Sequence, residues 1–176
     1  NSRFIKETYT RVLKGHIAVS NYKIRKNSSG SNIDKNARKS LNEIKLDYPH
    51  GTGHGVGYFL NVHEGPQSFS KNNKINLKSG MIISNEPGFY KEGSFGIRIE
   101  NLIYIKKNKF KELTMAPIEK DLLKKKMLNK KEIGWLNKAA LAHHSLLIHQ
   151  LNRVDKPLPD LGFFCAKQII WFFKYL

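Results

Sequence analysis

The sequence has one cysteine and no long apolar run. Because Cys165 is alone, an internal disulfide framework is excluded, and a reducing compartment is favoured, so we expect a cytoplasmic protein. The longest apolar patch, 169–173, is far shorter than the roughly 20 residues of a membrane-spanning helix. No secretory signal is apparent. We therefore expect a protein with no membrane segment, and 176 residues are enough to bury a core.

Acidic residues are scarce. Only 14 Asp and Glu accompany 31 Lys and Arg, which gives a formal net charge of +17. Strong basicity is typical of proteins that bind nucleic acid or anionic surfaces. Only six of these cations are arginine, whose planar fork suits phosphates and base edges. Asparagine is abundant, at 16 residues, and this bias toward lysine and asparagine is expected of an AT-rich genome. We favour a solvated lysine-rich surface without a specific nucleic-acid partner over a genuine preference for polyanions.

The hydrophobic spacing predicts an α+β fold, a mixed antiparallel sheet with flanking helices. Three stretches have helical spacing or helix-forming composition: 3–20, 33–44 and 131–151. Asn32 is the expected N-cap of the second helix. The glycine-rich segment 48–66 predicts short strands joined by tight turns, and 81–85 predicts a strand that ends in a Pro-Gly turn.

Residues 96–105 alternate with a period of two and predict one strand. One face carries Ile97, Ile99, Ile103 and Ile105. The other face carries Arg98, Glu100, Leu102 and Tyr104. A carboxylate in an apolar strand is costly unless it is paired or bound to a metal. Either a salt bridge with Arg98 or a metal ion would satisfy Glu100.

Three histidines and two carboxylates stand in short motifs between residues 50 and 100. The histidines belong to His50-Gly-Thr-Gly-His54-Gly-Val-Gly-Tyr-Phe-Leu-Asn-Val-His63-Glu-Gly-Pro. Glu86 belongs to Ser-Asn-Glu-Pro-Gly-Phe-Tyr, and Glu100 to Gly-Ile-Arg-Ile-Glu-Asn. A histidine alone is more often structural, but a histidine with two carboxylates can hold a hard or borderline divalent ion. His54 is the best candidate ligand because glycines on both sides leave its ring accessible.

The two carboxylates could divide the work of hydrolysis. One would bridge metal ions while the other takes a proton from water. His50 and His63 would then contact the substrate or donate to a tetrahedral intermediate.

These four motifs, in this order and at this spacing, resemble the catalytic domain of the Xaa-Pro aminopeptidases (aminopeptidase P). Segments 9–17, 33–38 and 135–137 resemble the same family, so the likeness covers roughly residues 3–137. The resemblance implies a pita-bread fold of the creatinase/methionine aminopeptidase type. It also implies a centre of two divalent ions, usually Mn²⁺, with Zn²⁺ or Co²⁺ as alternatives. The substrates would be peptides with proline at the second position, from which the N-terminal residue is released.

The motif match also implies roles for individual residues. His54, Glu86 and Glu100 match metal ligands, with Glu86 acting also as general base and Glu100 bridging the two ions. His50 and His63 match substrate-contacting histidines that stabilise the intermediate. Arg98 matches a position near the substrate proline.

The departures from the family are equally specific. The family uses five ligands, two of which are aspartates upstream of the first helix. Asp34 and Asp47 do not replace them, because they match other family positions. The chain begins with Asn rather than Met, so we expect a partial fold in which residues 1–137 form the C-terminal portion of the peptidase domain. We expect residues 138–176 to form a divergent tail, either read in a different frame from the family or replaced by another segment.

We therefore expect the isolated chain to be weakly active or inactive. A second copy of the chain or a complementing upstream fragment would be its protein partner. The alternative is an inactive remnant or a non-catalytic binding module of the same fold.

Overall fold

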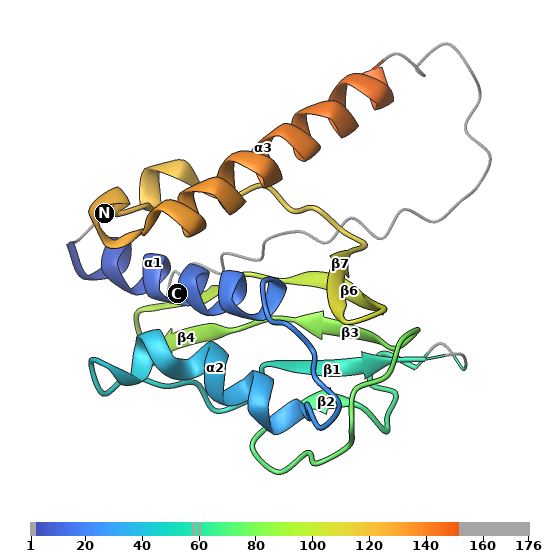
Figure 1. The fold of residues 1–176 in the computed structure, drawn as a ribbon. Coiled ribbons are helices and arrows are strands. Elements are labelled where there is room, and N and C mark those ends of the chain that lie inside the picture. The colour runs from blue at the N-terminus through green and yellow to red at the C-terminus, as the bar shows by residue number, and fades with distance from the viewer. Residues whose placement is uncertain (1–2, 58, 60, 152–176) are drawn as a thin grey trace.

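A computed structural model describes residues 3–57, 59 and 61–151 of the chain, and its helices and strands form separate layers (Figure 1). The helices are α1 (Arg3–Ser20), α2 (Gly30–Asn42) and α3 (Lys130–Leu151), with two short 3-10 turns, η1 (Lys120–Leu122) and η2 (Lys125–Met127). The strands are β1 (Gly53–Val56), β2 (Ser68–Phe69), β3 (Ile82–Asn85), β4 (Gly88–Lys91), β5 (Phe95–Arg98), β6 (Asn101–Lys106) and β7 (Lys109–Glu112).

Five of these strands form one sheet in the order β2-β1-β3-β6-β7, and every neighbouring pair is antiparallel. Strands β4 and β5 form a separate antiparallel hairpin. The predicted α+β class and the predicted strand over 81–85 are therefore confirmed. Segment 48–66 contains one strand, β1, and otherwise turns and loops in its described part.

The core lies between the helices and one face of the strands. On β6 the burial alternates, so that Asn101, Ile103 and Ile105 are buried while Leu102 and Tyr104 are partly exposed. Buried residues of α1 and α2 pack with the strands in two clusters: Tyr9, Val12, Leu13, Ile17, Leu41, Phe89, Phe95, Ile97 and Ile99 in one, and Val19, Ile33, Ala37, Phe69, Ile83, Ile103, Ile105 and Phe110 in the other. The other face of β3 and β6 carries Ile82, Ser84, Leu102 and Tyr104.

The second helix begins three residues earlier than predicted. Its N-cap is Ser29, not Asn32, and Asn32 occupies the third helical position of a capping box. The Oδ1 atom of Asn32 accepts a hydrogen bond from the Ser29 amide at 2.9 Å. The prediction was wrong because both residues of a capping box are good cap formers, and the spacing of apolar residues does not separate them.

The single strand predicted over 96–105 is wrong, because the structure divides it. β5 ends at Arg98 and pairs with β4, whereas β6 begins at Asn101 and pairs with β3. Burial still alternates through the break: Ile97, Ile99, Ile103 and Ile105 are all buried, as predicted. A period of two specifies which side chains are buried but not which strand lies alongside.

The last described helix, α3, matches the helix predicted over 131–151. It passes through residue 137 without a break, so the predicted boundary between a peptidase portion and a tail lies inside a helix and stays a prediction. The part of that tail from 152 to 176 lies outside the described residues. Among the described residues, no helix is both long and apolar enough to cross a membrane.

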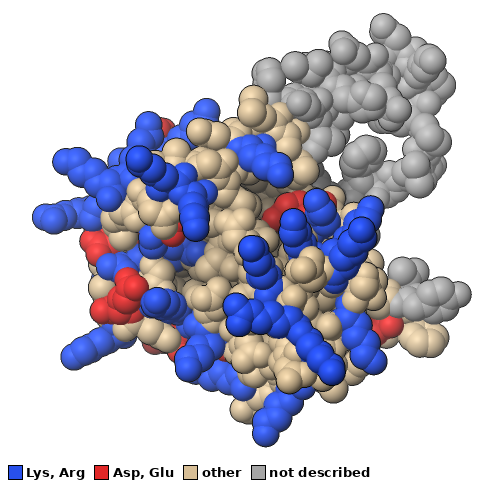
Figure 2. Space-filling model, viewed as in Figure 1, with Lys and Arg blue, Asp and Glu red and all other residues tan. Residues whose placement is uncertain are grey.

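Lysine and arginine side chains are spread widely over the face seen in Figure 2, with only a few acidic groups among them. They extend from the helices to the strands and do not form one narrow band. The preference for a solvated surface over a polyanion-binding one stays a prediction.

Candidate metal centre

Two carboxylates emerge side by side because of how β3 and β6 pair. Asn85, the last residue of β3, is paired with Asn101, the first residue of β6. Glu86 follows Asn85, and Glu100 precedes Asn101. Because the strands are antiparallel, both glutamates leave the same end of the pair. The Glu86 amide then donates to the Thr52 carbonyl at 2.8 Å, which ties this end to the loop before β1.

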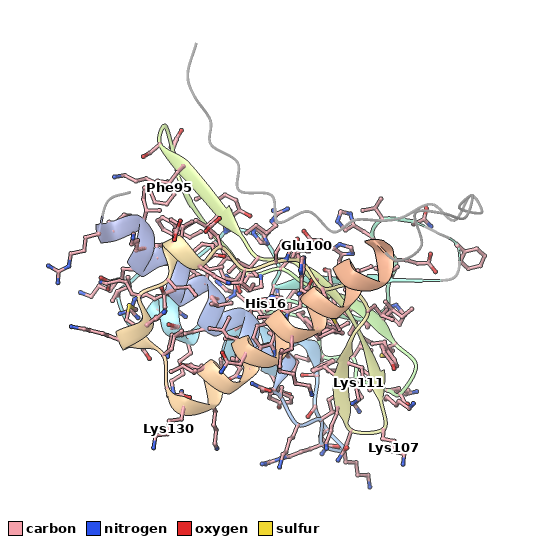
Figure 3. The ribbon with its side chains drawn as sticks, turned by 90° about the horizontal axis from the view of Figure 1, so that it is seen from above. His16, Phe95, Glu100, Lys107, Lys111 and Lys130 are labelled. Carbon is pink, nitrogen blue, oxygen red and sulfur yellow. The ribbon has the colours of Figure 1, made fainter. Side chains whose placement is uncertain are left out.

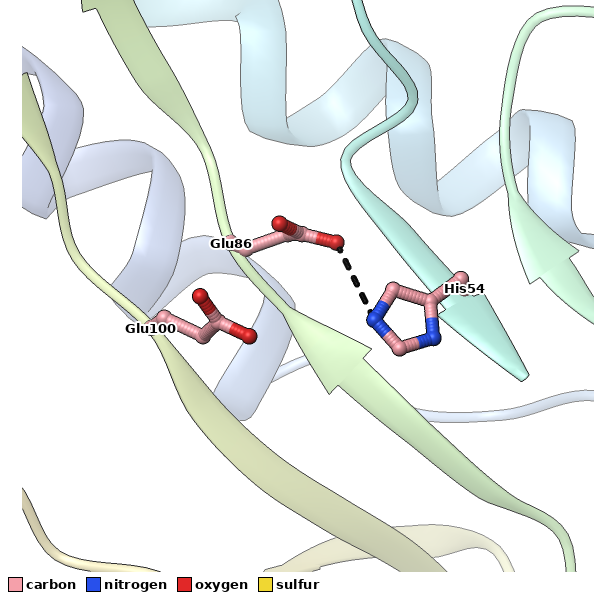
Figure 4. A group of neighbouring side chains, drawn as sticks. All are labelled: His54, Glu86 and Glu100. Atoms are coloured by element: carbon pink, nitrogen blue, oxygen red, sulfur yellow. Dashed lines mark ion pairs between the residues drawn. The ribbon is translucent and has the colours of Figure 1, made fainter. Parts of the chain in front are cut away.

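His54 reaches the same point from β1, the other neighbour of β3 (Figure 4). A Cβ atom added to Gly53 would lie 1.9 Å from the carbonyl oxygen of Ser84, so only glycine allows β1 to approach β3 this closely. The His54 amide donates to Oγ of Ser84 at 2.8 Å, and that hydroxyl donates to Oε1 of Glu86 at 3.0 Å. Ser84 thus links the backbone of His54 to the carboxylate of Glu86.

His54, Glu86 and Glu100 form a group with the geometry of a metal site. Each offers one ligand atom, and these atoms all lie within 4.8 Å of one another. Nε2 of His54 is 3.6 Å from Oε1 of Glu86 (Figure 4). Burial and the nearby charge of Glu100 raise the pKa of Glu86 above its ordinary value. A divalent cation between these groups would relieve the repulsion of the two carboxylates, so the donor set fits such an ion.

Arg98 contacts Glu86 and not Glu100. Its Nη1 atom lies 3.7 Å from Oε2 of Glu86, and the part of the chain that the structure describes holds no Arg98–Glu100 ion pair. The salt-bridge explanation of Glu100 from the sequence is therefore wrong. The chain bends between β5 and β6, which turns Arg98 toward the end of β3. Glu100 is then left for the metal-binding interpretation.

A hydrogen-bonded chain joins His50 to Arg98 through Tyr90. Nε of Arg98 donates to the Tyr90 hydroxyl at 2.8 Å, and that hydroxyl lies 2.9 Å from Nε2 of His50. Nδ1 of His50 is 2.7 Å from the Gly51 carbonyl, so Nδ1 carries the proton and Nε2 accepts from Tyr90. Burial and the positive charges of Arg98 and Arg38 lower the pKa of His50, which favours this neutral form.

Gly88 makes room for Tyr90, because a Cβ atom there would meet the tyrosine hydroxyl at 2.8 Å.

On the other side of the site, His63 packs against His54. Their ring centroids are 4.4 Å apart and the ring planes are nearly perpendicular, at 89°. The six residues singled out from the sequence thus form two neighbouring groups: His54, Glu86 and Glu100 with His63, and the chain from His50 to Arg98, which contacts Glu86.

A buried ion pair supports the loop that carries His50. Nε of Arg38 donates to Asp34 at 2.8 Å, and its Nη2 donates to the His50 carbonyl at 2.6 Å. Nη1 of Arg38 also donates to Asp47 at 2.6 Å, and the guanidinium stacks on Tyr48 at 3.9 Å. One arginine on α2 therefore fixes the path of the backbone into the histidine segment.

The sequence interpretation missed three residues of this site: Ser84, Tyr90 and Arg38. Ser84 and Tyr90 stand in the same motif as Glu86, two residues before it and four after it. Their position was thus visible, but their partners in β1 and β5 were not. Arg38 stands four residues after Asp34 on one helix face, and this spacing alone could have suggested the pair.

Comparison with known proteins agrees with this geometry. The profile of metallopeptidase family M24 matches residues 2–107, and that of the C-terminal region of peptidase M24 matches residues 107–145. Xaa-Pro aminopeptidase 1 of Dictyostelium discoideum is 46% identical over 144 residues, which are 74% of this chain and 23% of that protein. Aminopeptidase P2 of Arabidopsis thaliana is 46% identical over 146 residues, 75% of this chain and 21% of that protein.

Solved structures show the same relationship. X-prolyl aminopeptidase of Caenorhabditis elegans, described as a cytosolic enzyme with a di-nuclear active site, superposes with a TM-score of 0.80 at 34% identity, over 88% of this chain and 27% of that chain. X-Pro aminopeptidase of Thermotoga maritima superposes with a TM-score of 0.60 at 33% identity, over 67% and 33%. The chain thus spans about a quarter of the length of the curated relatives it matches. It belongs to metallopeptidase family M24 and has part of that family's pita-bread fold.

Proposed function

We propose that this chain contributes to the active site of a metal-dependent aminopeptidase that releases an N-terminal residue preceding proline. The observation that carries the proposal is the group of His54, Glu86 and Glu100, whose ligand atoms lie within 4.8 Å of one another. Two relatives support the choice of reaction, because Xaa-Pro aminopeptidase 1 of Dictyostelium discoideum and aminopeptidase P2 of Arabidopsis thaliana match 74% and 75% of this chain.

His54, Glu86 and Glu100 would hold the divalent ions. Bound ions would supply Lewis acidity, which activates a water molecule and polarises the scissile carbonyl. We propose Mn²⁺ as the ion, with Zn²⁺ or Co²⁺ as alternatives, since carboxylate donors suit Mn²⁺ and imidazole suits Zn²⁺.

Glu86 would act as general base and take the proton of the attacking water. Its carboxylate lies within the ligand group, where it could accept the proton of a water molecule held there. Its two oxygens have different surroundings: Oε1 accepts from Ser84 at 3.0 Å, and Oε2 faces Arg98 at 3.7 Å.

His63, His50 and Arg98 would bind the substrate. His63 stands against His54, where it could donate to a carbonyl oxygen that is under attack. Both nitrogens of His50 already have partners, Tyr90 and Gly51. A substrate that bonds to His50 must therefore displace the Tyr90 hydroxyl, which would also free Nε of Arg98 to meet the residue next to the scissile bond.

Two ions need more donor atoms than three side chains offer, so we propose that two further carboxylates complete the site. They would come from polypeptide outside this sequence, either a complementing fragment or a larger form of the same protein. A second copy of this chain could instead assemble with it, but it would bring the same three ligands. We also propose a cytoplasmic location, for which the description of the worm enzyme as cytosolic is the support.

The test is Mn²⁺-dependent hydrolysis of an Xaa-Pro peptide. The chain is assayed alone and together with the segment of the Dictyostelium relative that precedes the matched region. We expect little or no turnover by the chain alone, turnover by the mixture, and loss of that turnover in Glu86→Gln. Robust turnover by the chain alone would show that no further ligands are needed. No turnover in either case, with weak Mn²⁺ binding, would favour the inactive remnant or binding module.

A further inference from the structure

His16 of α1 is a fully buried histidine that the proposed chemistry does not use. It lies beside the segment that carries Glu100 (Figure 3). Its Nδ1 atom is 3.2 Å from the carbonyl oxygen of Ile99, and its Nε2 atom is 3.3 Å from Nδ2 of Asn101. These two residues flank Glu100 on either side.

The orientation of the Asn101 amide fixes the tautomer of His16. The amide of Ala116, which can only donate, lies 3.0 Å from Oδ1 of Asn101, and the Thr114 hydroxyl donates to the same oxygen at 3.1 Å. Nδ2 of Asn101 therefore faces His16, and Nε2 of the imidazole must accept. The proton then sits on Nδ1, which donates it to the Ile99 carbonyl.

The backbone of His16 reaches the second carboxylate segment. Its carbonyl oxygen accepts a hydrogen bond from Nδ2 of Asn85 at 3.1 Å, and Asn85 directly precedes Glu86. One residue of α1 is thus bonded to both strands at the point where their ligand-type side chains begin. A neutral imidazole suits this place, because burial lowers the pKa of His16 to about 4.

We propose that His16 is a positioning residue for the metal centre: it holds 99–101 and Asn85 in place and so sets the separation of Glu100 from Glu86. This inference rests on the proposed metal-binding function. Groups that orient metal ligands through hydrogen bonds affect metal affinity strongly, typically by 10- to 100-fold on mutation. The effect of His16 passes through backbone and amide groups to the carboxylates.

The test uses the full chain with three substitutions. His16→Phe fills the same space without polar atoms and leaves the Ile99 carbonyl and the Asn101 amide without their partner. His16→Gln keeps one donor and one acceptor. Val12→Ala is the matched control, because Val12 is fully buried on the same helix and belongs to the apolar core.

The first measurement is made without metal. Amide hydrogen exchange at 98–102 is expected to rise at least about 10-fold in His16→Phe relative to the wild type, and less in His16→Gln. In Val12→Ala we expect a lower melting temperature without this local increase. Exchange at 98–102 that rises equally in His16→Phe and Val12→Ala would overturn the proposal, since the histidine would then matter only for general stability.

The second measurement is the Kd of Mn²⁺ alone, from the spin resonance of the free ion. We expect the Kd to rise about 10-fold or more in His16→Phe, to rise less in His16→Gln and to be unchanged in Val12→Ala. A wild-type Mn²⁺ affinity in His16→Phe would overturn the positioning role. If the wild-type chain binds no Mn²⁺ at all, the proposed function fails, and the exchange measurement still decides whether His16 holds the two segments.

Discussion

Nη1 of Arg98 lies 3.7 Å from Oε2 of Glu86, and this contact joins the β4–β5 hairpin to the end of β3. The positive charge of Arg98 lowers the pKa of Glu86, whereas burial and Glu100 raise it, and the raising effects prevail. The proton affinity of Glu86 at the end of β3 thus depends on Arg98 at the end of β5 and on Glu100 just before β6.

Replacing Arg98 by methionine should raise the pKa of Glu86 further, because the only effect of Arg98 on it is to stabilise the charged form. The measurement is a carboxyl ¹³C titration of the metal-free chain, with Glu86→Gln used to identify the signal. An unchanged or lower pKa of Glu86 in Arg98→Met would contradict the prediction.

Glu112 on β7 should make the protein less stable as the pH rises. Burial raises the pKa of this carboxyl from 4.5 to about 7, and its Oε2 atom has no hydrogen-bond partner among the described residues. A raised folded-state pKa gives stability that is fully present below about pH 4.5 and is lost as the pH rises through about 7. The shift corresponds to about 3 kcal/mol.

Urea unfolding of the wild type and of Glu112→Gln, from about pH 4.5 to about pH 8, measures this loss. The free energy of unfolding of the wild type should fall by about 3 kcal/mol relative to that of the variant. Other titrating groups are common to both proteins and cancel in the comparison. Parallel pH profiles would show that Glu112 titrates normally.

Arg38→Ala should destabilise the chain by about 3 kcal/mol or more, because Asp34 would remain as a buried charge without its partner. Lys71→Ala is the matched control: Lys71 pairs with Asp47, which also contacts Arg38, but its side chain is 66% exposed. Such a pair contributes about 1 kcal/mol at most. Unfolding in urea compares the two variants, and equal losses would show that the Arg38 network adds nothing beyond a surface pair.

Gly53→Ala should cost about 2 kcal/mol of stability and weaken Mn²⁺ binding, since the new methyl group would push β1, with His54, away from the Ser84 carbonyl. Gly134→Ala in α3 tests whether any glycine substitution has this effect. A Cβ atom at Gly134 meets nothing within 4 Å, so this change should stabilise the helix by about 0.5 to 1 kcal/mol. Stability and Mn²⁺ affinity are measured for both variants by thermal unfolding and Mn²⁺ titration. Unchanged Mn²⁺ affinity in Gly53→Ala would refute the argument that the close approach of β1 to β3 positions His54.

The features predicted well from the sequence are those that depend on local spacing. The helix over 3–20, the strand over 81–85 and the burial of Ile97 and Ile103 follow from which residues are apolar and how far apart they stand. The choice of His54, Glu86 and Glu100 came from chemistry and from the family resemblance, and the structure brings their ligand atoms together.

The features that were wrong depend on partners distant in the sequence. The break between β5 and β6 is stabilised by the Ile99 amide, which donates to the Pro87 carbonyl, and by the bond from His16 to Ile99. Because this break separates β5 from β6, Arg98 contacts Glu86 rather than Glu100. A period of two within one segment contains no information about a helix 83 residues away in the chain.

The Asn101 amide has a consequence for the order in which a nascent chain can complete this site. Thr114 and Ala116 hold its oxygen, and the ring of His16 meets the edge of Trp135, with ring centroids 5.6 Å apart. Every residue of the ligand group is already synthesised when the ribosome reaches position 101, but these supports come later. The surroundings of Asn101 and His16 are therefore complete only when Thr114, Ala116 and Trp135 are in place.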